Sequence, residues 1–241
     1  MDFVERIKTE AEALRAAALL AGPEAVVPTC PDWTVHDLVT HIARVHSWVI
    51  KCLALPPQVA PPRPDTPPEE WNELLNWWDE RVLTMTSQLR ELSPDTPVWT
   101  FGAEKTASFW PRRQAHETAI HHLDALHATG HSVPTLLFDS EFAADGVDEF
   151  LTRMVPRQLE RGRRIEVTGR LLLHAADAGR TWEVRLAEGE VPVVGPVHDS
   201  ATDEDATVAG TADALYRAVW NRPSHAVVSG NRALLDGLPR P

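Results

Sequence analysis

The segment from Thr34 to Trp48 constrains the fold of this chain more than any other. Thr34 is a suitable helix N-cap, and Asp37 stands three positions later, which is the capping-box spacing. Beyond this start, side chains recur at helical spacing in one stripe, namely Leu38, His41, Val45, Trp48 and Cys52. His41 is in the middle of that stripe, so we expect a helix that turns an imidazole toward the protein interior.

A second segment, residues 112–124, carries a matching set of polar side chains. Glu117 and His121 are four residues apart, so a helix places them on one face, with Arg113 and Asp124 on or near it. An inward imidazole facing such a Glu/His pair makes three ligands for a divalent metal ion. The alternative is a core histidine whose ring nitrogens bond only to a carbonyl or hydroxyl group.

Two other histidines are expected to play no part in this site. His46 is roughly 140° around its helix from His41, and His122 is about 100° from His121. We therefore predict that both lie at an edge or on the surface. Asp124, one turn after His121, either orients that imidazole or pairs with an arginine.

The chain divides into a helical part and a mixed part. Periodicity predicts helices at residues 2–21, 34–53, 69–92, 111–129 and 139–155. After Pro156 the pattern changes to a hairpin around Gly179, a possible strand at 191–197, and a strand leading into an N-capped helix from Thr211. We expect an α+β protein with a helical domain at 1–155 and a small α+β domain at 156–241.

Two connections have unusual composition. Residues 56–68 contain seven prolines among thirteen positions, which predicts an extended surface loop, either a stiff connector or a PxxP docking segment. Residues 98–110 are rich in aromatic side chains. That loop either forms part of a pocket wall near the metal or only packs on the helices.

Bulk properties exclude several classes of function. The formal net charge of −12 argues against nucleic acid or anionic membranes as partners. No apolar run is long enough to cross a membrane, the N-terminus does not resemble a signal peptide, and two cysteines make no disulfide framework. We expect a cytoplasmic protein, and both a monomer and a homodimer are compatible with the sequence.

The ligand set favours catalysis over a structural role. Two histidines and one carboxylate leave one position of a four-coordinate zinc ion open, whereas structural zinc sites are closed by four ligands. The site would carry a formal charge of about +1, which favours an incoming hydroxide or thiolate. The residues alone therefore predict a metal-dependent enzyme that activates water or a thiol.

Three stretches resemble the mycothiol-dependent maleylpyruvate isomerase family. The first is Cys-Pro-Asp-Trp-Thr-Val-His-Asp-Leu-Val-Thr-His at 30–41, and the second is His-Glu-Thr-Ala-Ile-His-His-Leu-Asp-Ala at 116–125. The third is the tail, with Val-Ala-Gly-Thr-Ala-Asp-Ala-Leu-Tyr-Arg-Ala-Val-Trp-Asn-Arg-Pro at 208–223. The resemblance implies a DinB-like four-helix bundle followed by a small domain similar to sterol carrier proteins.

The resemblance also implies a site and a cofactor. It implies zinc at His41, Glu117 and His121, and mycothiol, an actinobacterial thiol, as cofactor or co-substrate for a small-molecule electrophile. Family members use an arginine of the C-terminal domain, and Arg222 matches it best, although the flanking residues differ. The alternative for Arg222 is to cap the helix that precedes it.

The activity implied is that of an isomerase of the maleylpyruvate type or of a thiol S-transferase. Two rivals stay open. One is a metal-dependent hydrolase with a water nucleophile, and the other is a non-catalytic regulatory or ligand-carrier protein that retains the metal.

Overall fold

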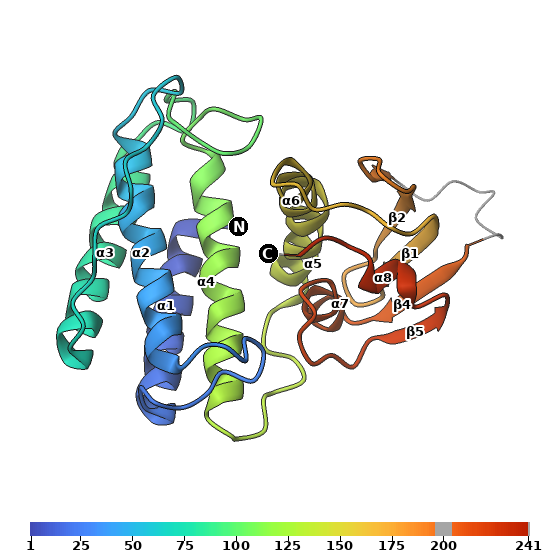
Figure 1. Ribbon diagram of the computed structural model, residues 1–241, viewed down its shortest axis with the longest axis horizontal. Coiled ribbons are helices and arrows are strands. Elements are labelled where there is room, and N and C mark those ends of the chain that lie inside the picture. Colours follow the sequence, from blue (N-terminus) through green and yellow to red (C-terminus); the bar gives the residue numbers. More distant parts are fainter. Residues whose placement is uncertain (196–203, 241) are drawn as a thin grey trace. The chain divides into compact units, whose positions relative to one another are not determined.

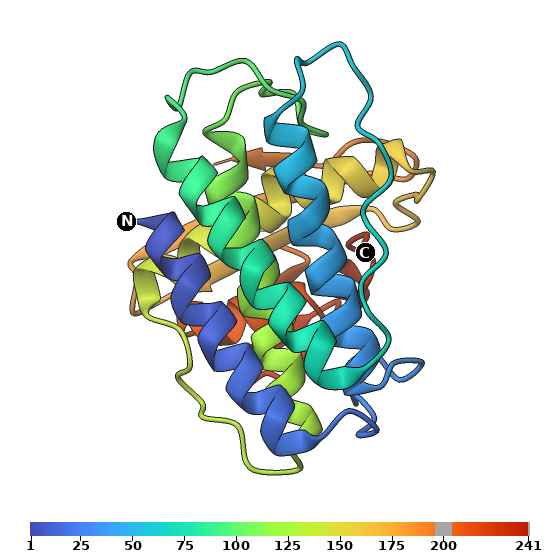
Figure 2. The ribbon, with the colours of Figure 1, turned by 90° about the vertical axis from the view of Figure 1, so that its left-hand side faces the viewer.

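The computed structural model describes residues 1–195 and 204–240, which form two compact units, Met1–Val133 and Pro134–Pro241. The first unit consists of four helices, α1 (Phe3–Ala21), α2 (Val35–Leu53), α3 (Trp71–Glu91) and α4 (Phe109–Ala128). They run side by side, with α1 packed mainly against α4 and α2 against α3 (Figures 1 and 2). The predicted α+β class and four-helix bundle are confirmed.

The predicted start of α2 is confirmed in detail. The backbone N–H of Asp37 donates to Thr34 Oγ1 at 3.2 Å, and the N–H of Thr34 donates to Asp37 Oδ2 at 2.9 Å. This reciprocal pair satisfies two backbone donors that the first turn of a helix would otherwise leave unpaired. The helix therefore begins at a fixed residue, which sets the direction of every side chain after it.

The predicted apolar stripe of α2 is only partly in the core. Leu38 and Cys52 are fully buried, whereas His41, Val45 and Trp48 are half-buried. The buried face is rotated from the predicted one and contains, among others, Val35, Leu38, Val39, Ile42, Ala43, His46 and Val49. The expectation that His41 points into the interior is wrong, because its side chain is 36% exposed.

The proline-rich segment is fastened to α2. Asp65 accepts hydrogen bonds from Ser47 Oγ at 2.7 Å and from Lys51 Nζ at 2.6 Å, and Lys51 Nζ also donates to the carbonyl oxygen of Arg63. Residues 56–68 contain no helix or strand, as predicted. The loop acts as a connector whose far end is held against the helix.

The second unit joins a bent helix to a sheet. Helix α5 (Ser140–Glu149) continues through a π-helical turn, Phe150–Met154, into α6 (Val155–Glu160). The predicted helix end at Pro156 is wrong. Proline there occupies the first turn of α6, where no backbone N–H is needed for the helix.

The described part of this unit contains one five-stranded sheet of order β3-β2-β1-β4-β5. Strands β1 (Gly169–Ala175) and β2 (Arg180–Leu186) form the predicted antiparallel hairpin, and β3 (Val193–Gly195) continues from β2. Residues 196–197 of the strand predicted at 191–197 lie outside the described residues.

Strand β4 (Ala206–Gly210) runs parallel to β1 and antiparallel to β5 (Val227–Gly230). Between them, α7 (Ala212–Val219) is capped by Thr211 as predicted and packs against β1 and β4, while α8 (Ala233–Asp236) follows β5 (Figure 1).

The division between the units lies before the helix at 139–155, which the sequence analysis assigned to the bundle. Helix α5 packs against α7 because Phe138 and Phe142 contact the ring of Tyr216. Gly146 permits this packing, since a Cβ there would lie 2.5 Å from the same ring. No helix among the described residues has both the length and the apolar character needed to cross a membrane.

The two histidines predicted at edges are both buried, so that prediction is wrong. His46 is fully buried, and His122 Nδ1 lies 2.7 Å from Glu10 Oε2 in a second buried pair. His46 is buried because its side of α2 faces Trp78 of α3 and Thr118 of α4. His122 is buried because its side of α4 faces Glu10 of α1. The angle between a side chain and one apolar stripe of its helix therefore does not show whether that side chain is exposed.

His46 is held as a neutral ring in a chain of hydrogen bonds. Trp78 Nε1 donates to His46 Nδ1 at 3.1 Å, and His46 Nε2 donates to Thr118 Oγ1 at 3.2 Å. The Thr118 hydroxyl in turn donates to the carbonyl oxygen of Gln114 at 2.7 Å. Burial lowers the pKa of His46 to about 3, because the imidazolium would be desolvated.

Acid should therefore destabilise the bundle through His46. An unfolded histidine protonates near pH 6.5 but the folded one only near 3, so this stability is complete above pH 6.5 and is lost as pH falls toward 3. From about pH 7 to about pH 5 the loss should be roughly 2 kcal/mol. Urea midpoints of unfolding, measured across this pH range for metal-free wild type and His46→Gln, test the prediction. If the midpoints of both proteins fall equally with pH, His46 is not the group responsible.

Candidate metal centre

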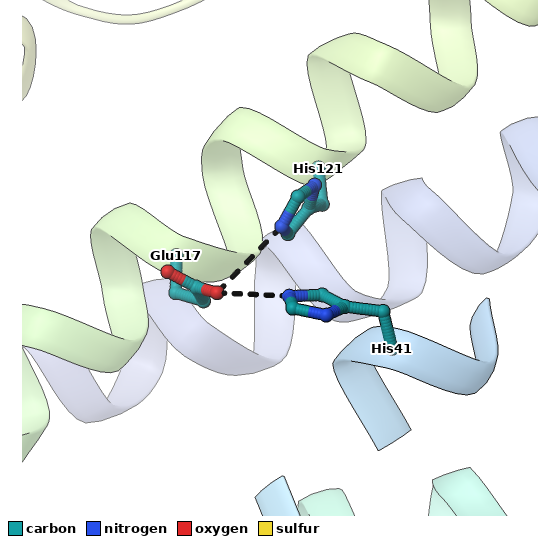
Figure 3. Close-up of side chains that lie close together, drawn as sticks. All are labelled: His41, Glu117 and His121. Atoms are coloured by element: carbon teal, nitrogen blue, oxygen red, sulfur yellow. Dashed lines mark hydrogen bonds and ion pairs between the residues drawn. The ribbon is translucent and has the colours of Figure 1, made fainter. Parts of the chain in front are cut away.

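Helices α2 and α4 bring together the three side chains proposed from sequence as metal ligands (Figure 3). His41 Nε2 lies 3.3 Å from Glu117 Oε1, and His121 Nε2 lies 3.6 Å from the same oxygen. One ligand atom from each residue lies within 4.8 Å of the other two. The i, i+4 spacing on α4 therefore produces the expected convergence on the imidazole of α2.

A buried carboxylate orients His121. Asp124 Oδ2 accepts from His121 Nδ1 at 3.0 Å, and Asp124 Oδ1 accepts from Thr29 Oγ1 at 2.6 Å. Asp124 is fully buried, so it holds the Nδ1 proton in place and leaves Nε2 as the ligand atom. The structure thus contains the orienting contact considered for Asp124.

An arginine orients the carboxylate. Arg113 is 2% exposed and donates from Nη2 to Glu117 Oε2 at 2.9 Å. This bond engages one oxygen of Glu117 and leaves Oε1 for the two histidines. Arg113 and Asp124 thus serve different ligands and restrict how each can turn.

The site is strongly polarised. Burial by itself raises the pKa of Glu117, but hydrogen bonds from His121 and His41 and the charge of Arg113 outweigh it and hold that pKa well below its usual range. Burial opposes protonation of His121, yet hydrogen bonds to Asp124 and Glu117 raise its pKa to about 9. Metal binding there displaces a proton, so affinity falls as pH falls.

The donor set fits a zinc-type ion. Tetrahedral ligands at zinc distances of about 2.0–2.1 Å lie about 3.3 Å apart, close to the two N···O distances observed here. Two imidazole nitrogens and one carboxylate oxygen supply three ligands and leave a fourth position for an incoming group. His41, Glu117 and His121 are therefore the residues that could hold the ion.

His41 connects the candidate centre to a pocket of about 680 Å³ within the first unit. Its lining residues are Asp32, Trp33, Asp37, Thr40, His41, Arg44, Val45, Trp48 and Pro64. The ring of Trp33 lies 4.9 Å from that of His41 and 6.1 Å from that of His121. The half-buried members of the α2 stripe, His41, Val45 and Trp48, thus line a pocket, while Leu38 and Cys52 belong to the core.

Several residues here were missed by the sequence reasoning. Thr29 bonds Asp124, Cys30 Sγ lies 3.9 Å from the same carboxylate, and Trp33 covers the imidazoles. All three belong to the segment just before the N-cap of α2. Their position just before the N-cap could have indicated this role, because the chain that enters a capped helix must pass close to the first turns of that helix.

The aromatic loop packs on the bundle. Phe109 and Trp110 form the first turn of α4 and are fully buried, and Trp99 and Trp110 both contact Trp48 edge to face. The loop thereby supports one lining residue of the pocket, although among the described residues none of its own members lines it.

Arg222 belongs to the second unit. Its Nη1 donates to the carbonyl oxygen of Trp220 at 2.9 Å, at the C-terminal end of α7. Asn221 has φ 56°, and the N–H of Arg222 bonds back to the carbonyl oxygen of Arg217. This left-handed residue ends the helix and turns the chain away from it.

Fold and site together define a helical bundle in which two histidines and a glutamate converge as a set that could hold a metal ion, joined in one chain to a small α+β unit. The family model of the mycothiol maleylpyruvate isomerase N-terminal domain matches residues 4–126, and that of the MDMPI C-terminal domain matches residues 141–237. The chain belongs to the mycothiol-dependent maleylpyruvate isomerase family.

Solved structures agree in fold. A crystal structure of the mycothiol-dependent maleylpyruvate isomerase aligns with a TM-score of 0.64 at 16% identity, covering 94% of this chain and 91% of that one. A histidine-to-alanine mutant of that isomerase gives the same values. No curated protein matches the chain in sequence.

Removing His41 should remove the metal. His41→Ala leaves two ligands on one helix, too few for tight binding, while the bundle keeps its apolar core. We expect one equivalent of zinc per chain in wild type after supplementation and a large loss in the variant, with unchanged helical circular dichroism. His36→Ala on the same helix is the control, and full metal retention in His41→Ala would refute the ligand assignment.

Proposed function

We propose that this chain is a metal-dependent enzyme that uses mycothiol as its thiol cofactor or co-substrate and acts on a small electrophile. The observation that carries the proposal is the His/Glu/His set, which leaves a ligand position open beside a pocket of about 680 Å³. Membership of the family and the likeness to a mycothiol-dependent isomerase support the choice of thiol.

A zinc-type divalent ion held by His41, Glu117 and His121 would supply a Lewis acid that keeps a coordinating thiol deprotonated at neutral pH. The chain's own residues prepare the site for that role. Asp124 holds the proton on His121 Nδ1, and Arg113 occupies one oxygen of Glu117. Trp33 covers the imidazoles and limits the access of water from that side.

Two activities share the first step, in which the thiolate sulfur attacks an electrophilic carbon of the substrate. In an isomerase, the former double bond rotates and the thiol is expelled, so no thiol is consumed. In an S-transferase the adduct is the product. Product analysis with mycothiol and a panel of electrophiles separates them by whether the thiol is regenerated.

Thiol binding should be visible on cobalt-substituted protein. Adding mycothiol should produce a sulfur-to-metal charge-transfer band, because the open position accepts the thiolate. His41→Ala should give no band. If wild-type protein with its full complement of cobalt stays silent, the thiol role is refuted and the hydrolase or non-catalytic reading takes its place.

We also propose that Arg222 binds a carboxylate of the substrate or a group of the thiol cofactor. Its guanidinium suits this task because its planar fork can hold a carboxylate through two hydrogen bonds. The residue follows the left-handed Asn221, at a point where the chain leaves α7, so its side chain is only half-buried. The competing role is the cap on Trp220 described above.

Arg222→Lys should keep metal content and folding but lower kcat/KM on a carboxylate-bearing substrate. The expected loss is roughly 1–3 kcal/mol of charge-assisted hydrogen bonding, because lysine lacks the fork. Steady-state kinetics on the metal-loaded variant measure it. Wild-type turnover in Arg222→Ala would assign the residue to helix capping alone.

A further inference from the structure

One wall of the pocket is a row of side chains on successive turns of α2. His41, Arg44 and Trp48 all line it. Arg44 is one turn beyond His41, about 4.5 Å further along the helix axis. Because side chains three positions apart are neighbours on a helix, Arg44 and His41 lie next to each other on this wall of the pocket.

Arg44 has no counter-ion of its own. It is exposed, and among the described residues it has no hydrogen-bond or ion-pair partner. The other arginines of α1 and α3 are paired, for example Arg15 with Asp79 and Arg90 with Glu5. An unpaired guanidinium on the wall of a pocket is available to an anionic ligand.

The acidic residues of the same pocket give a bound anion a direction. Asp37 is held by Thr34 at the first turn of α2, so His41 stands between it and Arg44 along the helix. Asp32 also lines the pocket, on the segment before that helix. An anionic group is attracted to Arg44 and repelled by Asp37. The anionic end of a ligand should therefore lie at Arg44, away from the N-terminus of α2.

Two indole rings give the pocket flat apolar surfaces. Trp33 lies against the His41 ring, and Trp48 is fixed by edge-to-face contacts with Trp99 and Trp110 at ring-centre distances of 5.2 and 5.6 Å. Such faces favour planar, conjugated or aromatic groups over bulky saturated ones.

The proline-rich loop contributes one residue to the pocket wall. Pro64 lines the pocket, and its neighbour Asp65 is bonded to Ser47 and Lys51 of α2. These bonds join the loop to the same helix that carries Arg44. The wall is therefore built in position before any ligand arrives, which lowers the entropy cost of binding.

We propose that Arg44 binds the carboxylate of a planar, conjugated electrophile and that this pairing sets the specificity of the pocket. The carboxylate lies at Arg44, and the conjugated carbons extend between the indole faces toward His41. This inference rests on the proposed function for the reactivity of the ligand, but the binding itself requires no thiol.

Calorimetry on the zinc-loaded full chain tests the binding without any chemistry. The probes are naphthoate, a planar carboxylate that does not react with thiols, and naphthamide, its neutral counterpart. The variants are Arg44→Gln and Arg44→Lys, with Arg90→Gln as the control for a surface arginine outside the pocket. Zinc content and circular dichroism establish that each variant is folded and loaded.

Arg44→Gln should weaken naphthoate binding by about tenfold and leave naphthamide binding unchanged, because only the charge-assisted bond is lost. Arg44→Lys should retain most of the affinity for naphthoate, since the charge persists without the fork. Arg90→Gln should match wild type. Once turnover is measured, Arg44→Gln should raise KM for a carboxylate electrophile, not for its methyl ester, and leave kcat unchanged.

Three results would overturn the assignment. Naphthoate affinity that survives Arg44→Gln but vanishes when zinc is removed would place the carboxylate on the metal. An equal loss for both probes would mean that Arg44 only supports the pocket wall, and no loss for either would mean that it touches neither. Because no thiol is present, the failure of mycothiol-dependent activity would leave the calorimetric result intact, and the two proposals stand or fall separately.

Discussion

The hydrogen bond between the buried carboxylate of Asp124 and His121 is the interaction on which the candidate metal centre depends. Asp124 is fully buried and accepts from His121 Nδ1 and from Thr29, so it joins α4 to the segment that leads into α2. A buried charge is costly unless every lone pair is engaged, so this arrangement admits little adjustment. It fixes the ring orientation of His121 and, through Thr29, the path of the chain that then places Trp33 over the imidazoles.

Helix α4 shows why the bundle can carry such a site. Fourteen of its 20 residues are buried, including several polar ones, and α1 and α2 both pack against it. Each polar group of this kind needs a partner, and the partners lie on neighbouring helices: His122 bonds Glu10 of α1, and Thr118 accepts from His46 of α2. These bonds fix how far each helix is shifted along its neighbour more closely than apolar packing alone would. They therefore also fix the positions of the candidate metal ligands on α2 and α4.

Local sequence signals predicted the helix starts and the ligand trio, but not the faces of the helices. The Thr34/Asp37 capping box and the spacing of Glu117 and His121 act within a few residues, so they can be read directly. Which side of a helix is buried depends on helices far away in the chain, and this is why both His46 of α2 and His122 of α4 were misplaced. The continuation of α5 past Pro156 has the same origin, because a π-helical turn positions the proline at the start of α6.

The half-buried side chains of α2 follow from a conflict between core and pocket. A helix of a four-helix bundle needs one apolar face for the core, and α2 has it in residues such as Ile42 and Val49. Trp48 lies beside that face and is only half-buried, so it is not needed to complete the core. It lines the same pocket as the unpaired Arg44. Binding of a small molecule over these partly exposed indole and guanidinium groups would be favourable for two reasons. It would bury apolar area of the indole, and it would pair the charge of the guanidinium. On the proposals made here, one capped helix therefore carries both His41, a candidate metal ligand, and Arg44, the group that would orient the substrate.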